Sequence, residues 1–69
     1  MNRAQKEIVQ RIAERDGLKP SRAEKLVEET VRACEECLSE DEDAYDEVED
    51  IIKEKLGLPP RTVIDAFGL

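Results

Sequence analysis

The chain has no histidine and no tryptophan, and only one Phe, one Tyr and two Cys among its 69 residues. Without histidine, the commonest general base is missing, so a Ser- or Cys-dependent catalytic triad has no partner. No glycine-rich loop that could hold a phosphate occurs. Paired carboxylates remain conceivable, but with 18 acidic residues a pair at any spacing is expected by chance. A chain this small also offers little room for a pocket that excludes water. We therefore expect a protein that is not an enzyme and carries no cofactor.

Long apolar runs are absent as well. The longest has two or three residues, far too few to span a membrane, and the N-terminal segment lacks the apolar stretch of a signal peptide. We expect an intracellular, cytoplasmic location. With so few aromatics the core has to be aliphatic, and a core of this size commonly contributes only about 3–5 kcal/mol. Because two cysteines cannot build a disulfide framework, self-association is the expected support, and a dimer is favoured.

Charge is distributed unevenly along the chain. Residues 1–33 hold eight Lys or Arg against six Asp or Glu, whereas residues 35–56 hold eleven acids against only Lys53 and Lys55. The first stretch is therefore weakly basic and the second strongly acidic, within a net charge of −7. Such asymmetry bears on the choice of partner and not on the fold.

Apolar residues recur at intervals of three and four along most of the chain, which is typical of amphipathic helices. The sequence predicts an all-α fold, a compact bundle of three to four short helices in a single domain over residues 1–69. The helices are expected at about 3–15, 21–38, 43–56 and 60–67. The apolar stripes of the second and fourth helices exceed what their neighbours can cover, and this surplus again indicates an oligomer.

Helix ends carry their own signals. Gly17 and Gly57 follow the first and third helices, where glycine commonly ends a helix. Ser21 and Glu24 have the spacing of a capping box for the second helix. Ser39 or Asp43 could cap the third helix, whose first turn is rich in acids.

Cys34 and Cys37 form a CxxC motif. In redox enzymes the first thiolate of this motif sits at a helix N-terminus, whereas here the motif lies near the C-terminal end of the expected second helix. Both thiols are expected to face the core, with pKa values raised by the neighbouring acids. A metal site shared between subunits and a disulfide between subunits stay open as alternatives.

The acidic run SEDEDAYDEVED has carboxylates at the opening spacing of a calcium loop. The pattern then fails, because Asp46 stands where glycine is required and Ile52 where the bidentate Glu belongs. A solvated helix face is the plain interpretation. Two sharper ones are an acidic surface that imitates nucleic-acid phosphates and inhibits a DNA-binding protein, and a helix that lies against basic residues of a second subunit.

The segment from Ile12 to Leu26 has the small-residue and apolar spacing of a helix-turn-helix, with Gly17 in the turn. The recognition helix would offer Ser21, Arg22 and Lys25 to DNA. More specifically, residues 1–38, MNRAQKEIVQRIAERDGLKPSRAEKLVEETVRACEECL, resemble the N-terminal helical hairpin of the HU/IHF family of nucleoid proteins. The resemblance implies a dimerising hairpin. The basic β-arms with which that family grips DNA have no counterpart after Leu38.

Our first hypothesis is a non-enzymatic protein–protein interaction or regulatory module that forms a homo-oligomer and turns an acidic helix toward a basic protein surface. The alternative is a DNA-binding regulator that uses Ser21, Arg22 and Lys25, although nucleic acid is a less favoured partner. Expected steering charges and apolar anchors for a protein partner are Glu47, Glu49, Asp50, Ile51, Ile52, Val63, Ile64 and Phe67.

Overall fold

The computed structural model describes all residues from Met1 to Leu69 and contains four helices and no strand. The helices are α1 (Arg3–Asp16), α2 (Pro20–Glu40), α3 (Tyr45–Leu56) and α4 (Pro60–Phe67). The expected all-α bundle is confirmed, and each expected helix occurs within two residues of its expected ends. No helix has both the length and the apolar character needed to cross a membrane.

Two of the expected helix ends are confirmed. Gly17 and Gly57 follow α1 and α3 with φ of 64° and 63°, in the left-handed region that costs a glycine nothing. The Gly57 amide donates to the carbonyls of Ile52 and Lys53, so these carbonyls at the end of α3 are satisfied.

The helix starts differ from expectation. Ser21 does not cap α2, because Pro20 already occupies its first turn and the Lys19 carbonyl accepts from the next turn. The capping box lies instead on α1, where the Asn2 side chain accepts from the Gln5 amide at 2.9 Å and Gln5 Oε1 accepts from the Asn2 amide at 3.2 Å.

The start of α3 also lacks the expected cap. Ser39 lies inside α2, and no side chain accepts from the first turn of α3. Asp43 does not serve as the cap, since Ala44 occupies the cap position, and the Asp43 amide donates to Asp41 Oδ1 at 3.0 Å within the connecting turn. Asp46 and Glu47 still place negative charge in the first turn of α3, where the helix dipole favours it.

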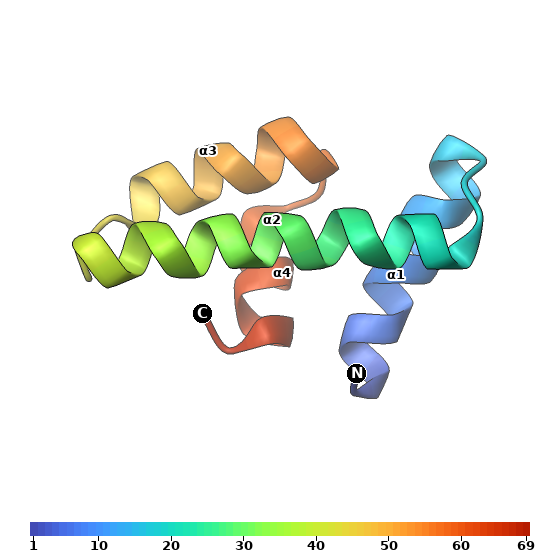
Figure 1. The fold of residues 1–69 in the computed structure, drawn as a ribbon, viewed down its shortest axis with the longest axis horizontal. Helices are drawn as coiled ribbons and strands as arrows, with labels where there is room; N and C mark the ends of the chain where they lie inside the picture. The colour runs from blue at the N-terminus through green and yellow to red at the C-terminus, as the bar shows by residue number, and fades with distance from the viewer.

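Helix α2 is the shared support of the fold. In Figure 1 it runs the length of the molecule, with α3 on one side and α4 on the other, while α1 crosses it near its beginning. α1 packs on α2, α3 packs on α2, and α4 contacts both α1 and α3. The α1–α2 junction therefore lies at one end of the 34 Å long axis and the α2–α3 junction at the other.

The core is aliphatic, as expected, and every helix contributes to it. Its members are Ile8, Val9, Ile12, Ala13, Ala23, Val27, Cys34, Val48, Ile52, Leu56, Leu58 and Val63. The one buried polar side chain, Thr30, donates to the Leu26 carbonyl at 2.8 Å, so it carries no unsatisfied group into the interior.

Side-chain hydrogen bonds tie distant parts of the chain together. Gln5 Nε2 on α1 donates to the Ala66 carbonyl on α4 at 3.0 Å. The Tyr45 hydroxyl at the start of α3 donates to the Leu69 carbonyl at 2.6 Å. The two bonds tie the C-terminal segment to α1 and to α3.

Candidate protein-interaction surface

Helices α2 and α3 meet along a line that one side-chain contact locates. The Cys37 thiol on α2 donates to Glu47 Oε2 on α3 at 3.0 Å. Residues one turn away on either helix must lie along the same line. These are Ala33 on α2 and Ile51 on α3, and both are partly exposed.

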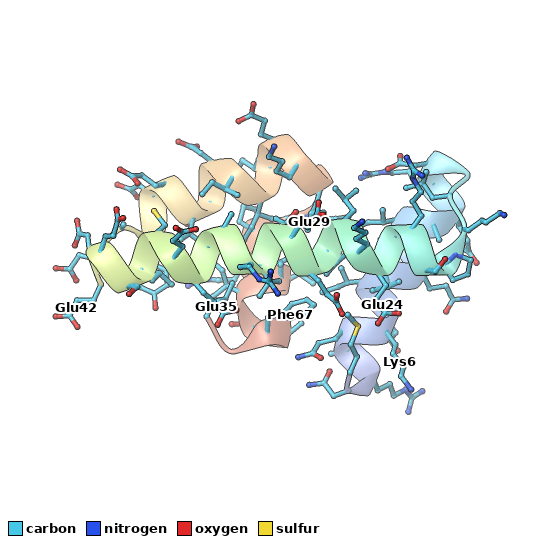
Figure 2. The ribbon with its side chains drawn as sticks, in the orientation of Figure 1. Lys6, Glu24, Glu29, Glu35, Glu42 and Phe67 are labelled. Atoms are coloured by element: carbon cyan, nitrogen blue, oxygen red, sulfur yellow. The ribbon has the colours of Figure 1, made fainter.

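Acidic side chains border this line on both helices. By helical spacing, Glu29, Glu36 and Glu40 share the Cys37 side of α2, and Asp50 and Glu54 share the Glu47 side of α3. Figure 2 shows Glu29 on the side of α2 that faces α3. We call this surface the acidic seam: its apolar residues are Ala33, Cys37 and Ile51, and its acids are Glu29, Glu36, Glu40, Glu47, Asp50 and Glu54.

None of the acids in the seam is neutralised by a cation. The two ion pairs of the structure are Arg3–Glu7 at 3.6 Å and Arg15–Asp16 at 3.0 Å, and both lie on α1. The six acids of the seam therefore face solvent without a basic neighbour within ion-pair distance. Their mutual repulsion is a cost that a basic partner would relieve.

The structure separates the expected anchor residues. Ile52 and Val63 are fully buried, with 0 % exposure, so they belong to the core of one chain and cannot contact a partner. The expectation that they are anchors is corrected for that reason. Ile51, next to Ile52, keeps part of its side chain at the surface because it stands 100° farther round the helix.

Three further expected residues do not join the seam. Glu49 is half-buried and lies one turn after Tyr45, on the other flank of α3. Ile64 and Phe67 are half-buried on α4, and Figure 2 shows Phe67 across α2 from α3. Of the expected partner-binding residues, Glu47, Asp50 and Ile51 belong to the acidic seam.

The two cysteines are free and differ from each other. Cys34 is buried in the core, as expected, whereas Cys37 is only half-buried. Burial raises the pKa of Cys34, and Glu35 adds to the rise. The hydrogen bond to Glu47 raises the pKa of Cys37 to about 11. The expected direction is confirmed, but for Cys37 the main cause is an acid on another helix.

Both thiols therefore keep their protons at neutral pH, whereas a nucleophile or metal ligand has to be a thiolate. No group of three His, Cys, Asp or Glu side chains in the structure is arranged to hold a metal ion. Within the chain, Cys34 packs in the core and Cys37 links α2 to α3 through its bond to Glu47.

The residues expected to face DNA do lie together. Ser21, Arg22 and Lys25 are exposed on the first turns of α2 and line one shallow depression. Leu18, Leu26 and Glu29 complete its lining. Glu29 also belongs to the acidic seam, so a phosphate in this depression would meet one acid beside two cations.

A second depression was not expected from the sequence. It lies between α1 and the start of α2, and its lining residues are Met1, Lys6, Val9, Gln10, Ala13, Glu14, Leu18, Pro20 and Glu24. Met1 is 45 % exposed, the largest value among the bulky apolar side chains. The i, i+4, i+8 spacing of Lys6, Gln10 and Glu14 was a signal that could have drawn attention to this face.

No protein-family model, curated protein or solved structure matches this chain.

Proposed function

We propose that this protein is a non-enzymatic protein–protein interaction module whose acidic seam binds a basic segment of a partner protein. The observation that carries the proposal is the set of unpaired carboxylates along two adjacent helices, with a partly exposed Ile51 between them. The carboxylates would attract a basic partner and fix its position along the helices. The apolar contact with Ile51, once water is excluded, would stabilise the complex.

The chemistry of the partner follows from the shape of the seam. Ala33, Cys37 and Ile51 form a narrow apolar line between two acidic rows. An amphipathic helix with apolar residues on one face and Lys or Arg on both flanks would match this arrangement. The proposal also includes self-association, which leaves the seam of each copy available.

A binding measurement with a defined probe tests the proposal. The probe is a fluorescein-labelled helical peptide with a leucine stripe flanked by lysines, read by fluorescence anisotropy at low and at physiological salt. Asp50→Lys is expected to weaken binding about tenfold, because it replaces an attraction with a repulsion at the contact. Ile51→Ala is expected to weaken binding by removing apolar contact at both salt concentrations.

Asp65→Lys is the matched control, since it changes the net charge by the same amount at an exposed position on α4, away from the seam. It is expected to weaken binding only slightly, through the long-range field, and this loss should vanish at high salt. Equal losses for Asp50→Lys and Asp65→Lys would show that only net charge matters, and would refute the seam as the site.

DNA binding is the second candidate, and the shared depression of Ser21, Arg22 and Lys25 is the observation that favours it. A salt titration with random duplex DNA tests it, because phosphate contacts make the affinity fall steeply as salt rises. Binding that is lost in Arg22→Glu would favour this candidate. No binding of duplex at low salt would exclude it.

A further inference from the structure

The depression between α1 and the start of α2 has an apolar floor and a charged rim. Met1, Val9, Ala13 and Leu18 supply apolar surface. The charged lining residues are Lys6 and Glu14 on α1 and Glu24 on α2. Figure 2 shows Lys6 on the N-terminal part of α1, on the same side of α2 as Glu24. This face lies away from the acidic seam, because α3 packs on the other side of α2.

The rim charges are ordered along α1. Lys6, Gln10 and Glu14 follow one another at intervals of four residues, so they form a single row on the exposed side of the helix. Lys6 and Glu14 stand about 12 Å apart along the axis, with Gln10 midway between them. Gln10 Nε2 donates to Glu14 Oε1 at 3.3 Å, so the row is internally connected.

This row is complementary to itself when reversed. If a second α1 lies antiparallel on the first, with the two Gln10 residues facing each other, Lys6 of each copy faces Glu14 of the other. We propose that a second copy of this chain docks here, across a two-fold axis near Gln10. The proposal rests on the self-association included in the proposed function and assigns it to a face that the apolar stripes of α2 and α4 did not indicate.

The distribution of charge favours a second copy of the chain as the partner, and it favours this face over the acidic half of the chain as the contact. Residues 35–56 carry eleven acids and two lysines, so contact between two such regions would bring like charges together. The row on α1 instead offers one cation and one anion at matched positions, and Glu24 on α2 is the one further charge of this face. A two-fold interface uses the same patch on both subunits, which is what a self-complementary row requires.

The exposed area is consistent with an uncovered face. The single chain exposes 4894 Å², whereas a compact monomer of 7.9 kDa exposes about 4,400 Å². A standard interface covers about 800 Å² per partner. A contact of that size around Met1, Val9 and Leu18 would cover more than the area by which this chain exceeds a compact monomer.

Such a dimer would hold its two acidic seams away from the joint. Two linked seams bind a partner with two basic segments more tightly than either seam alone, because the second contact becomes intramolecular. The dimer would thereby raise the apparent affinity of the proposed interaction without adding a new contact to either seam.

The test is a charge exchange read by sedimentation equilibrium. The unaltered protein is expected to approach twice 7.9 kDa as its concentration rises. Lys6→Glu and Glu14→Lys each create two repulsive contacts across the axis, and each variant alone is expected to raise the dissociation constant about tenfold. An equimolar mixture of the two variants is expected to restore dimerisation, since both contacts again join opposite charges.

Arg11→Glu is the matched control for Lys6→Glu. It makes the same charge change on the same helix, but Arg11 lines the separate depression between α1 and α4. It should leave the dimer intact, and circular dichroism should show that all variants keep their helix content. A protein that stays monomeric at millimolar concentration, a mixture that associates no better than its components, or an equal loss in Arg11→Glu would each overturn the proposal. Peptide binding by the acidic seam is measured separately, so either proposal can fail without the other.

Discussion

Replacing Ile51 and Ile52 one at a time by alanine tests which of these two side chains is buried in the core. The two residues are neighbours on α3 with the same side chain, but Ile52 is fully buried and Ile51 is partly exposed. Truncation to alanine removes three carbon atoms at either position. Any difference in the free energy of unfolding therefore reports the surroundings of the side chain and not its chemistry.

For Ile52→Ala we expect a loss of about 3 kcal/mol, of which burial of the three carbons accounts for about 2.4 kcal/mol and the remaining cavity for the rest. For Ile51→Ala we expect a loss below about 1 kcal/mol, since most of its surroundings can relax. A domain of this size has only about 3–5 kcal/mol in total, so Ile52→Ala should keep only about 0–2 kcal/mol at room temperature.

The assay is urea unfolding followed by circular dichroism at 222 nm, at a fixed low protein concentration so that association does not contribute. A lower melting temperature gives a second reading, at about 4–8 °C for each kcal/mol in a domain of this length. Equal losses for the two variants would refute the placement of Ile51 at the surface. A loss below 1 kcal/mol for Ile52→Ala would refute its place in the core.

Three further predictions concern local features. Gly57→Ala and Gly17→Ala should each lower the unfolding free energy by about 1 kcal/mol, because both positions have positive φ, and urea unfolding measures the loss. Asn2→Ala should cost about 1 kcal/mol through loss of the cap, again read by urea unfolding, and unchanged stability would contradict the capping box. Cys37 should react with iodoacetamide at half its limiting rate near pH 11, and Glu47→Gln should lower this midpoint toward 9.0. Because folded Cys37 keeps a proton that the unfolded chain loses, stability should fall as pH rises from about 9 to about 11, and Glu47→Gln should reduce that fall.

The sequence was sufficient to predict the helices because their signals are local. Each stripe of apolar residues repeats within one element, and Gly17 and Gly57 end their helices by a backbone preference of their own. The caps were less predictable because several polar residues compete for the same position. Pro20 occupies the first position of α2, so the cap falls on Lys19 and Ser21 lies inside the helix. The capping box forms instead at Asn2 on α1.

The candidate site was predicted only in part, since periodicity gives the direction of a side chain but not what covers it. Ile51 and Ile52 both belong to the apolar stripe of α3, and only the position of α2 and α4 decides which one is enclosed. The contact between Cys37 and Glu47 likewise depends on how two helices pack. Acidic character could be read from composition, whereas the line along which the acids gather could not.

The position of α4 has a consequence for how the molecule unfolds. α1 packs on α2 near one end, α3 packs on it toward the other, and the short C-terminal helix contacts both. Without α4, the packing of α1 would depend only on the first half of α2, and the packing of α3 only on the second half. Shortening the chain before Pro60 should therefore turn one cooperative melting transition into two, with hydrogen exchange becoming fast first in whichever half retains less apolar contact.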